Sequence, residues 1–210
     1  MKNIAIIGAG SVVFAKNIMA DTLWYEAFSD CEIRLMDVNP ERLATAGMPA
    51  RSINQELGTN ATIMETADRR KALDGADFVI CTVGVGGVEA TKDDLLIPAE
   101  FGLRQVVGDT LCVGGIFRSV RSIPVLLEIC ADMKQLCPNA LLINYSNPMA
   151  MHVLAVARAT SIHAVGLCHG VQGTSHTLRM IIAMLEQGVP EHIINAHMDR
   201  PFGDLQREKE

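Results

Sequence analysis

Short apolar runs alternate along the chain with longer segments in which apolar residues recur every three or four positions. Apolar runs of roughly four to eight residues between turn signals are typical of buried parallel strands, and a period of about 3.6 residues is typical of helices that cover a sheet. The pattern predicts strands over 3–7, 31–37, 61–65, 77–83, 140–145 and 163–167 and helices over 12–26, 41–57, 69–73, 90–100, 117–136, 148–159 and 172–186. This alternation predicts an α/β fold with a doubly wound parallel sheet.

One long stretch departs from the alternation. Residues 84–115 contain seven glycines and are less periodic than the rest of the chain. Long loops punctuated by glycine often carry functional residues. We therefore expect loops on both sides of the helix predicted over 90–100.

A glycine turn, Gly8-Ala9-Gly10-Ser11, follows the first predicted strand and precedes a predicted helix. In dinucleotide-binding turns the first glycine allows the tight bend, and the second lets backbone N–H groups approach a pyrophosphate at the positive end of the helix. Val13 occupies the place of the third glycine of that pattern, and the Ser11 hydroxyl is an additional donor for phosphate. The turn predicts a dinucleotide cofactor.

Asp37 ends the second predicted strand. A carboxylate at this place can accept hydrogen bonds from the adenosine ribose hydroxyls and would repel a 2′-phosphate. It therefore predicts NAD rather than NADP. The alternative interpretation is a structural turn between strand and helix that carries a surface aspartate.

Two further predicted strands end in segments that suit a ligand. Thr82-Val83-Gly84 closes the fourth strand, where the backbone of such folds passes along the cofactor. Asn147 follows the fifth strand, and Pro148 favours an extended Asn147 whose amide can bind sugar hydroxyls or a carboxamide. Asn147 as a helix N-cap, with Pro148 at the first helical position, is an alternative that is compatible with ligand binding.

Cys168 and His169 close the sixth predicted strand. A thiolate prefers soft or borderline metals, and His197 is the next candidate ligand along the chain. The alternative interpretation of Cys168 is a buried thiol at a strand end.

Composition narrows the classes of partner. The net charge is −6, and the longest charged run with basic residues, 68–71, is short, which argues against nucleic-acid binding. No apolar stretch approaches the roughly 18 residues that span a bilayer, so no membrane partner is expected. The N-terminus has one Lys followed by a predicted strand and no small-residue cleavage site, so no signal peptide is expected. The six cysteines form no C-x-x-C pair, which predicts a cytoplasmic protein with mostly buried thiols.

The chain resembles glycoside hydrolase family 4, whose members are NAD- and metal-dependent glycosidases related in fold to lactate and malate dehydrogenases. The Cys-His-Gly sequence followed by Val-Gln-Gly-Thr resembles the α-galactosidase and α-glucosidase branch of that family. The resemblance covers about residues 3–186 and rests on the segments 8–11, 36–42, 108–111, 114–115, 144–150 and 166–174.

The resemblance implies a redox-elimination reaction in place of hydrolysis by two carboxylates. NAD oxidises the sugar at C3, and the resulting ketone acidifies the hydrogen at C2. Mn²⁺ polarises the C2 and C3 oxygens as a Lewis acid, a tyrosine takes the C2 proton, and the aglycone leaves. Water then adds and the hydride returns, so NAD is recycled.

By position, the resemblance makes Cys168 the first metal ligand and Asn147 the substrate-binding asparagine. Asp109 is the candidate general acid, with a loop cap as its alternative role, and His169 is a candidate catalytic residue that hydrogen-bonds the substrate. His197, in an imperfect form of the family's Asn-His-Met segment, is the candidate second metal ligand. The predicted cofactor-binding residues are Gly8, Gly10, Ser11, Val12, Asp37, Arg42, Thr82, Val83 and Gly84.

Neither tyrosine of the chain, Tyr25 or Tyr145, matches the family's catalytic tyrosine. We expect residues 1–190 to form the NAD-binding domain and residues 191–210 to begin a substrate domain that is largely missing. The chain is accordingly expected to bind NAD with little or no glycosidase activity. The family also implies a homo-oligomer.

Two alternatives to the glycosidase remain open. An NAD-dependent 2-hydroxy-acid dehydrogenase would use Arg118 or Arg121 to bind the substrate carboxylate, and it would leave Cys168 and His169 unexplained. A non-catalytic NAD-binding remnant would bind the cofactor without turnover. Dependence on manganese separates the glycosidase from the dehydrogenase.

Overall fold

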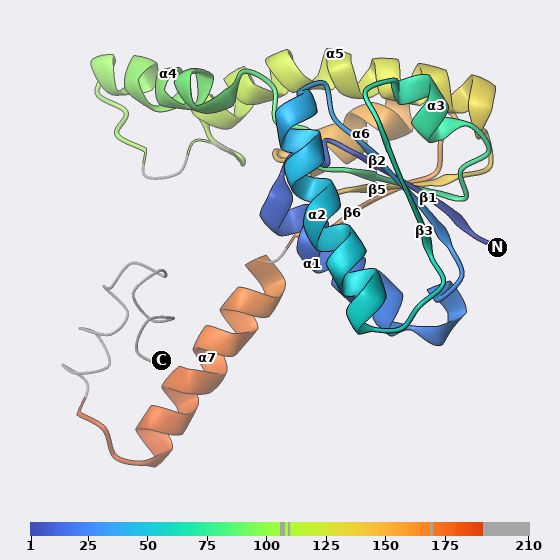
Figure 1. Cartoon of the computed structure of the whole chain (residues 1–210). Coiled ribbons are helices and arrows are strands. Elements are labelled where there is room, and N and C mark those ends of the chain that lie inside the picture. Colours follow the sequence, from blue (N-terminus) through green and yellow to red (C-terminus); the bar gives the residue numbers. More distant parts are fainter. Residues whose placement is uncertain (106–107, 109, 169, 191–210) are drawn as a thin grey trace. The chain divides into compact units, whose positions relative to one another are not determined.

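The computed structural model of the chain describes residues 1–105, 108, 110–168 and 170–190. It divides into two compact units, Met1–Leu167 and a second unit that begins at Cys168. The first unit is a parallel sheet with helices on both faces, and the second contains the helix α7 (Figure 1). The predicted division into 1–190 and 191–210 stays a prediction.

The sheet of the first unit has six parallel strands in the order β3-β2-β1-β4-β5-β6. The chain runs outward from β1 to β3 and then returns to β4 on the other side of β1, which is the doubly wound order of dinucleotide-binding folds. The predicted fold class is confirmed. The strands are β1 (Asn3–Ile7), β2 (Glu32–Met36), β3 (Thr62–Thr66), β4 (Phe78–Cys81), β5 (Leu141–Asn144) and β6 (Ala164–Gly166).

Most helices begin and end close to the places that apolar spacing predicts. None of the helices in the described part of the chain has the length and apolarity that a bilayer crossing requires. The helices are α1 (Val12–Trp24), η1 (Glu26–Phe28, a 3₁₀ turn), α2 (Pro40–Glu56), α3 (Arg69–Leu73), α4 (Gly87–Glu100), α5 (Val113–Leu136), α6 (Met149–Ala159) and α7 (Gly170–Glu186).

Successive residues of a strand point to opposite sides of the sheet. Helices cover both sides, so the sheet is buried on both faces. Ile4 and Ile6 of β1 pack with α1 and α2, whereas Ala5 and Ile7 belong to the core under α3, α5 and α6 (Figure 1). The carboxyl ends of β1, β2, β4 and β5 thus meet at one edge of a rigid sheet. This edge is where ligands bind in such folds.

The structure differs from the sequence prediction at the start of α5. This helix begins at Val113, four residues before the predicted start, and includes Gly114 and Gly115 in its first turn. A Cβ atom on Gly114 would collide with the carbonyl oxygen of Asp94, and one on Gly115 with that of Thr110. The glycines therefore let neighbouring backbone cross the helix closely, although glycine by itself disfavours a helix.

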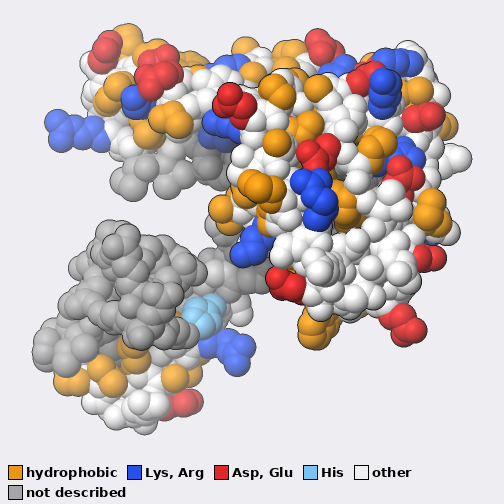
Figure 2. Space-filling model, viewed as in Figure 1, with side chains coloured by type: hydrophobic (Ala, Val, Ile, Leu, Met, Phe, Trp, Pro, Cys, Tyr) orange, Lys and Arg blue, Asp and Glu red, His pale blue; other side chains and the backbone are white. Residues whose placement is uncertain are grey.

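Figure 2 shows that, on the visible face of the first unit, Lys and Arg side chains are interspersed with Asp and Glu side chains. This face carries no continuous basic surface of the kind that attracts nucleic-acid phosphates.

Candidate functional site

The turn after β1 is fixed against the ends of β2 and β4. Gly8 has φ of 90°, and a Cβ on it would lie 2.9 Å from the carbonyl carbon of Thr82 and from the nitrogen of Val83. The N–H groups of Gly8 and Ala9 donate to the Met36 carbonyl at 2.9 and 3.0 Å, and the Thr82 hydroxyl donates to the Gly8 carbonyl at 2.9 Å. Only glycine fits this position, because both the backbone angle and the close approach exclude a side chain.

The second glycine of the turn makes room for Asp37. The Gly10 N–H donates to Asp37 Oδ2 at 2.8 Å, and the Asn39 N–H donates to Oδ1 at 2.9 Å. A Cβ on Gly10 would lie 2.5 Å from Asp37 Oδ2 and 2.8 Å from the Arg42 Cβ. Since each carboxylate oxygen has more than one acceptor position, Asp37 can still accept hydrogen bonds from a ligand. The structure thus brings Gly10, Asp37 and Arg42 together.

Asn39 orients the first turn of α2 beside Asp37. Its side chain accepts the N–H groups of Glu41 and Arg42, both at 3.0 Å, and Pro40 occupies the first helical position. This is the usual way in which Asn and Pro begin a helix. The cap holds Arg42 beside the glycine turn.

The N-terminus of α1 is open to an anion. Its N-cap residue Ser11 makes no side-chain cap hydrogen bond, and the first turn of the helix contains no acidic residue. The first amides of such a helix carry partial positive charge and donate to anions such as phosphate. Val13, in place of the third glycine, is 70 % exposed and therefore does not push α1 away from the sheet.

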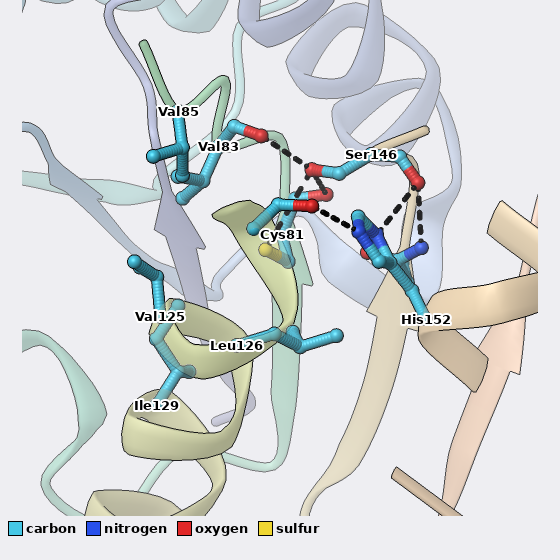
Figure 3. A pocket seen from close by; sticks show the side chains of 10 residues that line it. Cys81, Val83, Val85, Val125, Leu126, Ile129, Ser146 and His152 are labelled. Atoms are coloured by element: carbon cyan, nitrogen blue, oxygen red, sulfur yellow. Dashed lines mark hydrogen bonds between the residues drawn. The ribbon is translucent and has the colours of Figure 1, made fainter. Parts of the chain in front are cut away.

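The ends of β4 and β5 are joined to each other and to α5. The Ser146 hydroxyl donates to the Val83 carbonyl at 2.9 Å (Figure 3). Arg118 Nε donates to the Asn147 carbonyl at 3.2 Å. Pro148, not Asn147, is the N-cap residue of α6, so the helix-cap alternative for Asn147 is wrong.

A small cavity of about 10 Å³, close to the size of one water molecule, lies under these strand ends (Figure 3). Its polar lining includes Asn144, Ser146, Ser122 and His152, all buried. Burial raises the pKa of the Cys81 thiol, which lines the same cavity, and so keeps this thiol protonated and unreactive. The sequence pattern did not predict this buried cluster of polar side chains. Its only signal in the sequence was a histidine and a serine at core positions of predicted helices.

The structure gives Arg121 a structural role. Its guanidinium binds the Asp94 carboxylate with two hydrogen bonds, of 3.1 and 2.6 Å, and its Nε donates to the Val85 carbonyl at 3.0 Å. Asp94 is 1 % exposed, and its hydrogen bonds raise the pKa of Arg121. Because this fork of donors is occupied, Arg121 is a poor candidate for binding a substrate carboxylate.

The candidate metal and acid–base residues lie largely beyond what the structure describes. Cys168 is exposed, which contradicts the alternative of a buried thiol, and its Sγ accepts the Gly170 N–H at 3.4 Å. Asp109, His169 and His197 lie outside the described residues. Within the described ranges, no three His, Cys, Asp or Glu side chains are grouped so that they could hold a metal ion.

Comparison with known proteins settles the family. Residues 3–184 match the family model described as Family 4 glycosyl hydrolase. The chain belongs to glycosyl hydrolase family 4. Membership of family 4 confirms the resemblance.

Individual members of family 4 show how much of a relative this chain covers. It is 42 % identical to an alpha-galactosidase of Bacillus subtilis (strain 168) over 92 % of this chain and 45 % of the relative. It is 37 % identical to an alpha-glucosidase of Erwinia rhapontici over 93 % of this chain and 41 % of the relative. The chain thus spans less than half the length of the curated relatives that it matches.

The fold is shared with a solved 6-phospho-alpha-glucosidase from gut microorganisms, a structure in complex with NAD and Mn²⁺. The TM-score is 0.69 at 24 % sequence identity, over 80 % of this chain and 38 % of the other.

Proposed function

We propose that this chain is the cofactor-binding part of an NAD- and Mn²⁺-dependent glycoside hydrolase that acts on α-galactosides. The observation that carries the proposal is the glycine turn at the open end of α1, with the Asp37 carboxylate bound to the Gly10 N–H at 2.8 Å, in a chain of family 4. The α-galactosidase of Bacillus subtilis, at 42 % identity, supports the choice of substrate. An α-glucoside is the second candidate because of the Erwinia relative.

The described residues fit NAD. Gly8, Gly10, Ser11 and Val12 present the end of α1 to the pyrophosphate, as helix N-termini do in such folds. Asp37 accepts hydrogen bonds from the adenosine ribose, and an acidic side chain at this place disfavours a 2′-phosphate. Bound NAD supplies an acceptor for a hydride from the sugar.

The remaining proposed cofactor residues lie at the start of α2 and at the end of β4. Arg42 stands beside Asp37 at the start of α2. Thr82, Val83 and Gly84 extend from β4 along the path of the cofactor, and Thr82 also holds the glycine turn through the Gly8 carbonyl.

The proposal for Mn²⁺ rests on Cys168 and on the family. Cys168 offers an exposed sulfur donor, of the kind that borderline metals accept, and the solved 6-phospho-alpha-glucosidase holds Mn²⁺ together with NAD. We assign His197 as the second ligand, Asp109 as general acid, and His169 and Asn147 as substrate-binding groups. A bound metal would act as a Lewis acid on the sugar oxygens.

We further infer that residues 1–190 form the NAD-binding domain and 191–210 the start of a substrate domain, and that the protein forms a homo-oligomer. Cys31, Cys81, Cys130, Cys137 and Cys168 are free thiols in the described part of the chain, which supports a reducing cytoplasmic setting.

Calorimetry tests this function. Purified chain is titrated with NAD, with NADP, and then with Mn²⁺ in the presence of saturating NAD. We expect NAD to bind, NADP to bind much more weakly, and Mn²⁺ to bind once NAD is present. Absence of NAD binding would overturn the proposal, and NAD binding without Mn²⁺ binding would favour the non-catalytic remnant.

Hydrolysis of nitrophenyl α-galactoside is measured in the same preparation. Little or no hydrolysis is expected, because the chain's two tyrosines are poorly placed to serve as the base. Tyr25 follows α1, and the ring of Tyr145 packs against Phe14 with centroids 6.4 Å apart. Rapid hydrolysis would refute this part of the proposal.

A further inference from the structure

The proposed function leaves a buried histidine, His152, without a role. His152, on α6, is 2 % exposed and faces two other elements (Figure 3). Its Nδ1 lies 3.2 Å from the Ser146 carbonyl oxygen, at the end of β5, and its Nε2 lies 2.7 Å from the Ser122 hydroxyl oxygen, on α5. The ring therefore bridges the β5–α6 turn to α5.

A proton count shows which form of the ring holds this turn. The Ser122 oxygen also lies 2.6 Å from the Arg118 carbonyl, so three contacts meet in a row. A neutral imidazole and a hydroxyl supply two protons for these three contacts. Burial, and then the nearby Arg118 charge, lower the pKa of His152, whereas its hydrogen bond to the Ser146 backbone raises it; the net direction is down. The ring is therefore neutral near pH 7.

In the neutral ring, the tautomer decides which contact is made. With the proton on Nδ1, the ring donates to the Ser146 carbonyl and accepts from the Ser122 hydroxyl. With the proton on Nε2, the lone pair of Nδ1 would face the Ser146 carbonyl oxygen, which also repels. The first tautomer satisfies both sides of the ring but leaves the 2.6 Å contact between the Ser122 hydroxyl and the Arg118 carbonyl without a proton. The second keeps that contact and loses the hydrogen bond to Ser146. Our proposal requires the first tautomer.

Ser146 passes this constraint to the edge of the sheet. Its carbonyl also accepts the Asn144 side-chain amide at 2.9 Å, and its hydroxyl donates to the Val83 carbonyl at 2.9 Å. Ser146 thus links the ring of His152, through its carbonyl, to the end of β4, through its hydroxyl. The adjoining residue, Asn147, has its own carbonyl held by Arg118.

We propose that His152 is a positioning residue for the nicotinamide half of the cofactor, which it sets through the Ser146 carbonyl and the hydrogen bond from Ser146 to Val83. In a doubly wound sheet the two halves of a dinucleotide lie on opposite sides of the switch point. Here β1 and β2 carry the adenosine side, with Asp37, and β4 and β5 carry the other half. The proposal rests on the proposed function only in requiring that NAD binds.

Two amide substitutions separate the two sides of the ring. In His152→Asn the side-chain amide lies near the position of Nδ1 and can still donate to the Ser146 carbonyl. In His152→Gln the amide reaches toward the position of Nε2 and faces Ser122 instead. Ser146→Ala, a small change, removes the hydrogen bond to Val83 directly. Ser119→Ala is the control, because Ser119 is a buried serine on α5 that bonds the Gly115 carbonyl and Met151 and makes no described contact with the ring.

The readout is the dissociation constant for NAD compared with that for ADP-ribose, which lacks the nicotinamide. We expect His152→Gln and Ser146→Ala to weaken NAD binding about fivefold to tenfold, as the loss of one buried hydrogen bond does, and to change ADP-ribose binding less than about twofold. His152→Asn and Ser119→Ala are expected to stay within about twofold of the parent for both ligands. In the parent, ¹⁵N NMR of the histidine ring should show the Nδ1-protonated tautomer.

Each other outcome has a separate meaning. Equal weakening of NAD and ADP-ribose would show a general structural role and overturn the proposal, as would unchanged NAD binding in both His152→Gln and Ser146→Ala. An Nε2-protonated ring would also overturn it. If the parent chain binds neither ligand, the proposed function itself fails, which is a different result. Thermal unfolding of every variant confirms that it is folded, and Ser146→Ala keeps the test decisive if a His152 variant does not fold.

Discussion

Replacing Gly10 by alanine tests the link between the glycine turn and Asp37. The backbone of Gly10 does not have positive φ, so the conflict is one of space. The added Cβ would lie 2.5 Å from Asp37 Oδ2 and 2.8 Å from both Asp37 Cγ and Arg42 Cβ, and the carboxylate has to move. If Asp37 binds NAD as proposed, the ribose then loses a hydrogen bond to a charged acceptor, which contributes about 1.5–3 kcal/mol. Because Asp37 is only half-buried, the lower end applies, and we expect NAD to bind about tenfold to thirtyfold more weakly.

Calorimetry on four variants checks this reasoning. Asp37→Ala alone should weaken NAD binding by a similar factor and narrow the gap between NAD and NADP. Gly10→Ala added to Asp37→Ala should cost much less than it does in the parent, since two of its three short contacts are with Asp37. Gly58→Ala, at φ of 64° with open space around it, is the control that lowers stability without touching the site. If Gly10→Ala binds NAD as tightly as the parent, or if the two substitutions are additive, the reasoning is refuted.

Three further predictions concern stability and the metal. Arg121→Met leaves the buried Asp94 carboxylate unpaired and should therefore lower the free energy of unfolding by about 3 kcal/mol, measured by urea titration. A loss below about 1 kcal/mol would contradict a structural role for the pair. The Asn3 N–H donates to the Asp77 carboxylate at 2.8 Å, and this hydrogen bond is the main cause that lowers the pKa of Asp77. The Asp77 carboxylate therefore stabilises the fold at pH values above its ordinary pKa, and this stabilisation is lost as the pH falls through the lowered pKa. Asp77→Asn should therefore make the unfolding free energy less dependent on pH below about pH 4, and an unchanged acid profile would argue against it. Cys168→Ser should abolish Mn²⁺ binding measured at saturating NAD and leave the NAD dissociation constant unchanged; equal Mn²⁺ affinity would remove Cys168 from the metal site.

The sequence predicted the sheet well because a central parallel strand needs apolar residues on both of its sides. The residues of β1 and β4 are almost wholly apolar, and they lie where the pattern placed them. The proximity of Gly10 and Asp37 also followed from local rules, since both stand at the ends of neighbouring strands.

Features that depend on distant packing could not be predicted. The early start of α5 reflects the backbone that crosses Gly114 and Gly115, and glycine propensity alone argues for a loop there. The contact between Ser122 and His152 joins two helices that are separated by β5, and neither residue belongs to a recognisable motif. A buried polar pair of this kind becomes visible only when both helices have been placed on the sheet.

The contact between Gly10 and Asp37 also constrains how the gene can change. A side chain at position 10 is incompatible with a carboxylate at position 37, because both would occupy the same space. A descendant that lost the acid would lose two of the three short contacts at position 10 and keep only the one with the Arg42 Cβ, whereas one that retained the acid would keep glycine there. Substitutions at these two codons are therefore expected to occur together across homologous genes.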